Sequence, residues 1–308
     1  MKVYGNLFNK DVELMKSVWN ELFLVRAMRT SFGYGSTGGH PNIVQWIRHV
    51  QVPPFEHTQF NYAASLYELM DADLHFALQH NQLTIREVRH CLFDVLCALD
   101  FLHSNQMVHQ NISSQTVLVS KDFDVKLTNF RHCVHVHQIK AFSKTYLTAN
   151  IKNYRAPEIL MQSFDLISLP IDLFAVGCLF AEMLLGRPLF EARHYLEQLE
   201  QLVKLVGVPE MNDNLLSGVS YLASKSLKRV ADSGQFHTDR FEETFPMLEQ
   251  CPEAMHLLKQ LLAFWPKDRI DVREAIRHPF FDCIRQRKEQ ELNQVLGVHF
   301  GRGGACGC

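Results

Sequence analysis

The 308-residue sequence lacks several features that mark specialised classes of protein. No two of its eight cysteines have the Cys-x-x-Cys spacing of zinc sites, and most of them lie in apolar stretches. We therefore expect reduced thiols in a protein core. No run of 18 apolar residues is present that could span a membrane, and the first residues do not resemble a signal peptide. These absences favour an intracellular protein, in the cytoplasm or the nucleus.

The charge balance argues against a second group of functions. Lys and Arg number 31, Asp and Glu number 33, and no long basic run occurs. Because nucleic-acid-binding surfaces need an excess of positive charge, we expect no nucleic-acid partner. We also expect no association with a membrane. The composition is 47% hydrophobic, which is enough for one large domain or two lobes.

The spacing of apolar residues predicts a small mixed lobe followed by a large helical lobe. Helical periodicity predicts helices over residues 11–31 and 84–104. Runs of strand-forming residues predict strands at 43–52, 62–69, 117–119 and 125–127, the last two joined as a hairpin. From Ile171 onward the pattern is mainly helical, and the boundary between the lobes is expected near Met70.

Five motifs that occur in a fixed order resemble those of a known family. Residues 154–160 have the sequence Tyr-Arg-Ala-Pro-Glu-Ile-Leu, and residues 172–178 have Asp-Leu-Phe-Ala-Val-Gly-Cys. Gly-Arg-Pro-Leu-Phe, Lys-Asp-Arg-Ile and His-Pro-Phe-Phe follow at 186–190, 267–270 and 278–281. The set resembles the C-lobe of protein kinases, and in particular that of the mitogen-activated protein kinases and their close relatives in the CMGC group.

The resemblance implies an α+β fold, the bilobal protein kinase fold with a truncated β-rich N-lobe and a mainly helical C-lobe. Residues 1–70 would form the partial N-lobe, with one helix and two strands, and residues 71–283 the C-lobe. Residues 284–308 would form a C-terminal helix and a Gly/Cys tail. Two interpretations of the short N-lobe stay open: residues upstream supply its first strands, or the protein functions without them.

The resemblance also implies several residues with structural roles. Glu158 would form a buried ion pair with Arg269, which ties the segment before the C-lobe helices to the last of those helices. Asp172 would accept hydrogen bonds from the backbone around His109. The hydrophobic spine that joins the two lobes in this family would contain Val25, His109 and Phe130.

The catalytic loop departs from the family pattern. Kinases have His-Arg-Asp-x-Lys-x-x-Asn, whereas residues 109–116 read His-Gln-Asn-Ile-Ser-Ser-Gln-Thr. Asn111 stands in place of the catalytic base, Ser113 in place of the phosphate-contacting lysine and Thr116 in place of the metal-binding asparagine. We therefore expect no intact catalytic residue in this loop.

The magnesium motif of kinases, Asp-Phe-Gly, is also changed, to Asn129, Phe130 and Arg131. An amide has no net charge and is a poor ligand for a hard divalent cation. Arg131 would place a positive charge near the vacated metal position. We therefore predict no bound metal and no cofactor. ATP and magnesium are expected only if the protein is an active kinase.

Seven residues fall at positions that line the nucleotide pocket of kinases: Lys2, Glu21, Tyr67, Glu68, Met70, Asp73 and Val117. Lys2 would be either the ATP lysine, which pairs with Glu21, or the residue that follows that position, because the alignment is uncertain by one or two residues here. Tyr67 falls at the gatekeeper position, where a bulky ring narrows the rear of the adenine pocket. These positions bind a nucleotide only if the pocket binds one at all.

Three other patterns resemble ligand sites but favour simpler interpretations. The glycine-rich run at 33–38 follows a helix, whereas the phosphate loop of a kinase joins two strands upstream of that helix, so we interpret the run as an insertion. The Asp-Phe-Asp sequence at 122–124 precedes the strand that leads to Asn129 and is predicted to be a hairpin tip. The histidines and cysteine of residues 132–137 suggest a metal site, but a His-rich polar loop is the favoured interpretation.

These changes favour a catalytically impaired protein kinase homologue that acts as a scaffold or allosteric regulator in kinase signalling. Its partners would be other proteins, such as kinases or their substrates. The alternative is an active mitogen-activated-type serine/threonine kinase with atypical site residues. A working kinase should place another carboxylate near Thr116 or Asn129, and the sequence offers none. A decayed gene product without function is the third interpretation.

The short N-lobe also predicts a surface for association. Without the first strands, the sheet that contains residues 43–52 would have an open edge. The apolar face of the 11–31 helix, which would carry Leu14, Val18 and Leu22, would lose its cover.

Overall fold

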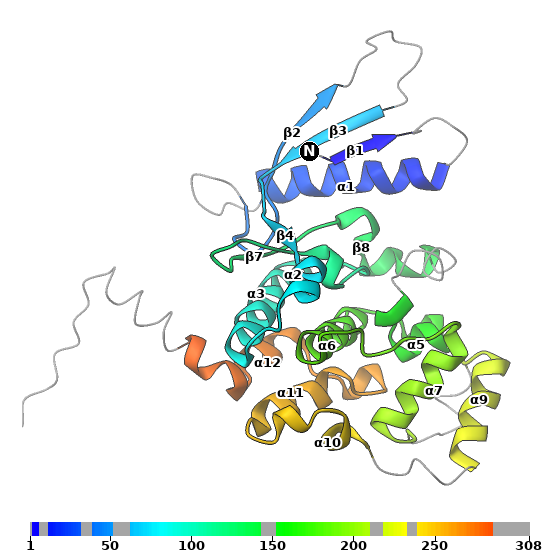
Figure 1. Cartoon of the computed structure of the whole chain (residues 1–308). Helices are drawn as coiled ribbons and strands as arrows, with labels where there is room; N and C mark the ends of the chain where they lie inside the picture. Colours follow the sequence, from blue (N-terminus) through cyan, green and yellow to red (C-terminus); the bar gives the residue numbers. More distant parts are fainter. Residues whose placement is uncertain are drawn as a thin grey trace, which may run out of the picture.

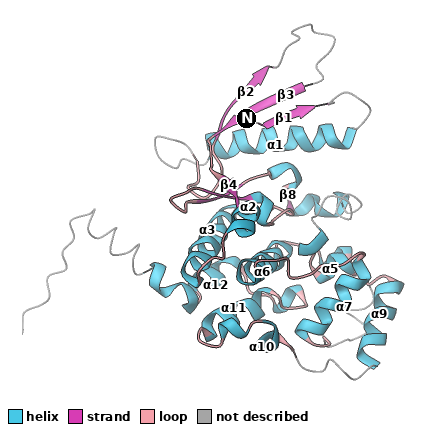
Figure 2. Cartoon of the chain, viewed as in Figure 1, coloured by secondary structure: helices cyan, strands magenta, loops and turns pink. Residues whose placement is uncertain are grey.

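The computed structural model describes residues 2–5, 12–31, 39–51, 62–142, 152–209, 218–232 and 239–285. A small lobe, consisting of a three-stranded sheet above one helix, lies over a larger and mainly helical lobe (Figure 1). Figure 2 shows that the longer strands belong to the small lobe, while helices make up most of the large one. This is the bilobal arrangement that the sequence motifs predict.

The sheet of the small lobe is antiparallel. Its strands are β1 (Lys2–Gly5), β2 (Trp46–Gln51) and β3 (Tyr62–Tyr67), in the order β1-β3-β2. The strand expected from residue 43 begins only at Trp46, because the preceding residues bind the other lobe. Ile43 forms an isolated bridge with Leu127, and the backbone N–H of Val44 donates to the Leu127 carbonyl at 3.0 Å.

Helix α1 (Val12–Ser31) carries one buried stripe. Val18, Glu21 and Val25 follow one another at spacings of three and four residues, which places them on one face of a helix, and each is at most 3% exposed. The helix lies against the 3-10 helix η2 (Phe130–His132), and the side-chain amide of Asn20 donates to the Cys133 carbonyl at 2.6 Å. The small lobe is therefore tied to the large one at the segment where a kinase holds its magnesium motif.

We predicted the wrong apolar face of α1 to be exposed to solvent. Val18 is buried and Leu22 is half-buried, while the side chain of Leu14 lies outside the described residues. The large apolar side chains that do face solvent are Trp19 and Phe23, at 73% and 65% exposure. Val18 is covered because the stripe of Val18, Glu21 and Val25 faces the protein interior. Its burial therefore does not depend on further strands at the edge of the sheet.

A strand and two helices begin the large lobe. They are β4 (Ala72–Asp73), α2 (Leu74–His80) and α3 (Ile85–Ser104). The boundary predicted near Met70 thus lies in the connection between β3 and β4. Thr84 caps α3 through a capping box: its hydroxyl accepts from the Glu87 N–H at 3.3 Å, and the Glu87 carboxylate accepts from the Thr84 N–H at 2.7 Å. These two bonds explain why the helix starts where the sequence predicts.

A hairpin and a short strand pair carry the loops of the candidate site. Strands β6 (Val117–Val119) and β7 (Val125–Leu127) pair antiparallel, and the segment 122–124 lies at their tip as predicted. Strand β5 (Met107–Val108) pairs with β8 (Val134–His135). The catalytic-loop segment therefore begins at the end of β5, and the segment of Asn129 begins at the end of β7.

The remaining helices of the large lobe surround α6 (Pro170–Leu185), which is buried along nearly its whole length. Gly177 lets α6 approach the end of α11, since a Cβ there would lie 2.8 Å from Leu262 Cδ2. The other helices are α5 (Pro157–Leu160), α7 (Tyr195–Val206), α9 (Tyr221–Asp232), α10 (Phe241–Thr244), α11 (Pro252–Leu261) and α12 (Val272–Arg277). Short 3-10 turns include η1 (Ser114–Thr116), η4 (Lys152–Tyr154) and η8 (Pro279–Phe281).

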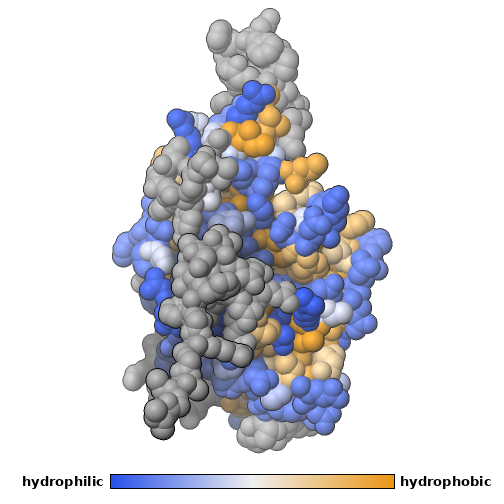
Figure 3. Space-filling model, turned by 90° about the vertical axis from the view of Figure 1, so that its left-hand side faces the viewer, coloured by the Kyte–Doolittle hydropathy of each residue, from blue (hydrophilic) through white to orange (hydrophobic). Residues whose placement is uncertain are grey.

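Of the helices within the described ranges, none is long and apolar enough to cross a bilayer. On the face drawn in Figure 3, hydrophobic side chains form separate patches among hydrophilic ones. The glycine-rich run at 33–38 and nearly all of the tail predicted at 284–308 lie outside the described residues.

Candidate functional site

Asp172, in the first turn of α6, organises the segment that corresponds to the catalytic loop. Its carboxylate is 1% exposed and accepts hydrogen bonds from the backbone N–H of His109 at 2.7 Å and of Gln110 at 2.8 Å. The ring of His103 contacts the same carboxylate at 3.1 Å. The backbone bonds expected of Asp172 are therefore present, and they hold the loop against the central helix of the large lobe.

His109 connects the loop to the segment of Phe130. Its Nε2 lies 3.1 Å from the Thr128 carbonyl, while its Nδ1 accepts from the backbone N–H of Asn111 at 3.3 Å. One nitrogen must donate and the other accept, so the ring is neutral with its proton on Nε2. Burial lowers the pKa of His109, which agrees with a neutral ring. The ring meets Phe130 edge-on at 5.3 Å, and Val25 is buried in the same core.

The residues at the remaining catalytic-loop positions bind one another. Thr116 donates its hydroxyl to the Asn111 carbonyl at 2.8 Å, and the same oxygen accepts from the Ser113 backbone N–H at 3.0 Å. Ser113 and Thr116 are buried. Asn111 is also buried, but its side-chain oxygen has no hydrogen-bond partner among the described residues. Within the loop itself, these hydrogen bonds are therefore made by hydroxyl and backbone groups and not by charged side chains.

Lys2 is the lysine that pairs with Glu21, which fits the first of the two alignments that the sequence left open. Its ammonium lies 2.6 and 2.8 Å from the two carboxylate oxygens of Glu21, which is 1% exposed. The same nitrogen lies 3.4 Å from Oδ1 of Asn129. Strand β1, helix α1 and the end of β7 thus bring together a lysine, a glutamate and an amide.

Arg131 and His132 lie next to this group. Burial lowers the pKa of Lys2, Glu21 opposes that shift, and Arg131 adds to it by charge repulsion. Burial and then Arg131 lower the pKa of His132 to about 4. His132 is therefore neutral near pH 7.

The low pKa of His132 predicts a loss of stability in acid. A histidine in the unfolded chain has a pKa near 6.5, whereas the pKa of His132 in the folded protein is about 4. Between these values the unfolded chain binds more protons, so the free energy of unfolding falls as the pH falls from about 6.5 towards 4. We expect His132→Gln to flatten this slope in urea unfolding measured across the range, and to leave stability at pH 7.5 near the wild-type value. An unchanged slope in the variant would contradict the assignment.

Two of the predicted nucleotide-pocket residues, Glu68 and Asp73, form hydrogen bonds within the protein. Glu68 binds Lys126 Nζ with both oxygens at 2.8 Å and accepts from the Gln45 N–H at 2.6 Å. Asp73 caps α2 by accepting from the Phe76 N–H at 2.7 Å. The other positions range from buried to half-buried: Tyr67, Met70 and Val117.

The ion pair predicted between Glu158 and Arg269 is present and fully buried. The guanidinium nitrogens Nη1 and Nη2 lie 2.9 and 3.1 Å from the two carboxylate oxygens. Arg269 also donates to the carbonyls of Pro170, Ala263 and Phe264. These bonds join α5, the start of α6 and the segment after α11, so one arginine holds three parts of the large lobe.

A buried polar network that was not predicted from the sequence lies beside the catalytic-loop segment. Ser114 donates to Glu182 at 2.9 Å, and the Tyr154 hydroxyl donates to the other oxygen of the same carboxylate. His75 reaches its edge, with Nδ1 4.0 Å from Glu182. Burial raises the pKa of Glu182, and the two hydroxyl donors oppose the shift. A glutamate inside the apolar sequence of α6 was the signal that could have indicated the network.

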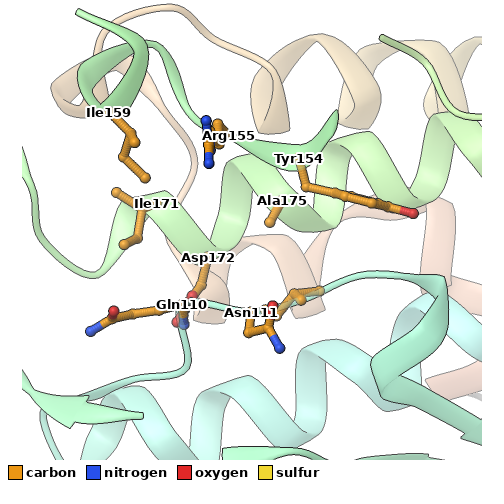
Figure 4. A pocket seen from close by; sticks show the side chains of 9 residues that line it. Gln110, Asn111, Tyr154, Arg155, Ile159, Ile171, Asp172 and Ala175 are labelled. Atoms are coloured by element: carbon orange, nitrogen blue, oxygen red, sulfur yellow. Dashed lines mark hydrogen bonds between the residues drawn. The ribbon is translucent and has the colours of Figure 1, made fainter. Parts of the chain in front are cut away.

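A small pocket opens between the loop, α6 and the segment that leads into α5 (Figure 4). Gln110 and Asn111 line one side of it, and Tyr154 and Arg155 lie across from them. The cavity volume is about 20 Å³, which is room for about one water molecule. Gln110 Nε2 and Asn111 Oδ1 lack hydrogen-bond partners among the described residues, so a water there would satisfy them.

The histidine-rich segment, residues 132–137, lies within the described residues. Over the part of the chain that the structure describes, no group of three or more His, Cys, Asp or Glu side chains is placed to hold an ion. The rings of His135 and His137 stack at 5.0 Å, and burial raises the pKa of the Cys133 thiol.

Comparison with known proteins gives the same family as the motifs. Residues 10–281 match the protein kinase domain. Mitogen-activated protein kinase MKC1 of Candida albicans is 30% identical over 96% of this chain and 56% of its own length. Mitogen-activated protein kinase 8 of Oryza sativa subsp. japonica is 32% identical over 83% of this chain and 44% of its own length. Mitogen-activated protein kinase 6 of Arabidopsis thaliana is 28% identical over 94% and 68%.

The chain therefore spans about half the length of the first two of these relatives. The match to the kinase domain covers most of the chain, and the fold, the Lys2–Glu21 pair and the Glu158–Arg269 pair agree with it. The chain belongs to the protein kinase family and is similar to the mitogen-activated protein kinases.

Proposed function

We propose that this kinase homologue does not catalyse phosphoryl transfer and acts by binding other proteins, as a scaffold or allosteric regulator in kinase signalling. The observation that carries the proposal is the pair of amides, Asn111 and Asn129, at the positions of the base and of a magnesium ligand. A general base alone contributes roughly 10²–10⁴-fold to the rate of an enzyme. Without the metal-borne electrostatics on which phosphoryl transfer depends, little of the rate enhancement would remain.

The side chains at the metal positions do not suit magnesium. Magnesium prefers charged oxygen ligands in a strict octahedral arrangement. Asn129 is neutral, and its oxygen faces the Lys2 ammonium at 3.4 Å. The Thr116 hydroxyl is held by the backbone of its own loop. Asn129 thus lacks the charge of the aspartate that kinases have at this position, and the Thr116 hydroxyl is already engaged by its own loop. Both facts support the proposal that the protein works without this ion.

The alternative is an active mitogen-activated-type serine/threonine kinase that uses ATP with atypical residues. It is favoured by the intact Lys2–Glu21 ion pair, which active kinases require, and by the names of the similar proteins. The same ion pair is compatible with a non-catalytic protein, because it also holds α1 against the sheet. The two functions therefore differ in one measurable quantity, the transfer of phosphate.

The test is a transfer assay with radiolabelled ATP, magnesium and a generic basic protein substrate. We expect the wild-type chain to give the same signal as Asn111→Ala, because Asn111 has no carboxylate to lose. A contaminating kinase would give equal signals in both preparations. If the wild type transfers phosphate and Asn111→Ala does not, the protein is an active enzyme and the proposal is refuted.

A further inference from the structure

Two histidines from different elements of the large lobe form a hydrogen bond with each other. Nδ1 of His256, on α11, lies 2.8 Å from Nε2 of His278, which stands directly before η8. The ring centroids lie 5.1 Å apart and the ring planes differ by 26°, which agrees with a hydrogen bond made edge to edge. His256 is exposed, whereas His278 is buried. The pair therefore joins the surface of α11 to the turn that begins η8.

The bonds of His278 determine where the protons of the pair are. Its Nδ1 accepts from the backbone N–H of Phe280 at 3.2 Å, so this nitrogen carries no proton. A neutral imidazole has one N–H, so the proton of His278 is on Nε2 and is donated to Nδ1 of His256. Both rings are then neutral, and both nitrogens of His278 have a partner.

A further proton on the pair breaks one of these two bonds. Protonation of His256 at Nδ1 sets two N–H donors against each other across 2.8 Å. Protonation of His278 at Nδ1 removes the acceptor of the Phe280 N–H. The pair can therefore bind a proton only if the rings separate or the bond to Phe280 is lost.

The charges around His278 do not favour a positive ring. Burial lowers the pKa of His278, and the His256 ring and Arg285 act in the same direction. Asp282 and Glu253 oppose the shift. Other charged side chains on the helices around this turn are Lys259 of α11, Arg277 of α12 and Arg89 of α3. Arg285 donates to the His278 carbonyl at 3.2 Å, so a charged His278 ring would lie in the same turn as a bound guanidinium.

We propose that the His256–His278 pair is an acid-sensitive latch between α11 and η8, which is closed while both rings are neutral and opens when the pair takes up a proton. Because His256 is exposed, its ring can turn into water and carry the charge there. His278 then keeps its bond to Phe280 but loses its partner on α11. The latch controls how firmly η8 and the residues up to Arg285 are held against α11, a property that does not depend on phosphoryl transfer.

The first measurement is the position of the His278 proton in the wild-type 308-residue chain, read from nitrogen NMR spectra of labelled histidine. At about pH 7.5 we expect the proton on Nε2, with Nδ1 unprotonated. As the pH falls to about 5.5, below the ordinary histidine pKa near 6.5, the His256 ring should become charged. The Nε2 proton of His278 should then exchange with water and its signal should be lost.

The second measurement is hydrogen exchange of the Phe280 amide, corrected for the intrinsic effect of pH. Its rate should rise roughly 2–10-fold from about pH 7.5 to about pH 5.5, the equilibrium equivalent of one neutral hydrogen bond. In His256→Asn the amide oxygen can accept from Nε2 of His278 but cannot take up a proton. The rise should therefore be absent in this variant.

Two controls make the result specific. His80→Asn removes an exposed histidine that contacts the Phe76 carbonyl, and it should show the same rise as the wild type. His132→Gln should also keep the rise, which separates the latch from the acid effect predicted for His132. The thermal midpoint of His256→Asn at neutral pH shows whether the variant is folded, and the wild-type spectra test the latch without any variant.

The inference is overturned if the proton of His278 is on Nδ1 at neutral pH, or if Phe280 exchange in the wild type does not rise in acid. It is also overturned if folded His256→Asn shows the wild-type rise, or if His132→Gln abolishes it. None of these outcomes bears on the proposed function, which is measured by phosphate transfer.

Discussion

Glu158→Ala is expected to lower the free energy of unfolding by about 3–5 kcal/mol, although the residue has no part in catalysis. The change would leave the Arg269 guanidinium in a fully buried position without its carboxylate. Arg269→Ala should cost at least as much, because it also removes the donor to three backbone carbonyls. Urea unfolding followed by circular dichroism measures both values.

The exposed pair of Arg273 and Asp100 is the matched control. It is also an arginine–carboxylate contact, at 3.2 Å, but the Arg273 side chain is 64% exposed. Arg273→Ala should therefore cost no more than about 1 kcal/mol. If Glu158→Ala and Arg269→Ala both melt within a degree of wild type, the buried pair does not contribute as we infer.

Asp172→Ala should have an effect of similar size, at least about 3 kcal/mol, for a different reason. The carboxylate accepts from the buried N–H of His109 and the partly buried N–H of Gln110, and it contacts the ring of His103. Without it these groups have no acceptor, and each buried unsatisfied donor costs roughly 1–3 kcal/mol. We expect a lower urea midpoint with little change in the slope of the transition.

Asp71→Ala is the control for Asp172, since Asp71 is an exposed carboxylate that accepts from one backbone N–H, that of Lys121. Water can replace its acceptor, so the expected cost is below about 1 kcal/mol. A cost for Asp172→Ala as small as that for Asp71→Ala would mean that the loop of His109 is not held by this carboxylate.

The large lobe was largely predictable from the sequence because its determinants are local. The capping box at Thr84 and the proline and glycine that flank α6 are short-range signals for helix ends. The Glu158–Arg269 pair spans 111 residues, yet it could be predicted because both partners lie within motifs of the kinase family. The hairpin of β6 and β7 likewise follows from its turn.

The sequence by itself determined the family, the helical lobe and the change of carboxylates to amides at Asn111 and Asn129. Only the tertiary structure decided that Lys2 is the partner of Glu21, because the two lie on separate elements and neighbouring positions on a strand fit the sequence equally well. It also decided that β2 begins at Trp46, since Ile43 and Val44 bind Leu127 across the lobes. The same holds for the burial of Val18: apolar periodicity predicts a face of a helix, but contact with the rest of the protein decides which face is covered.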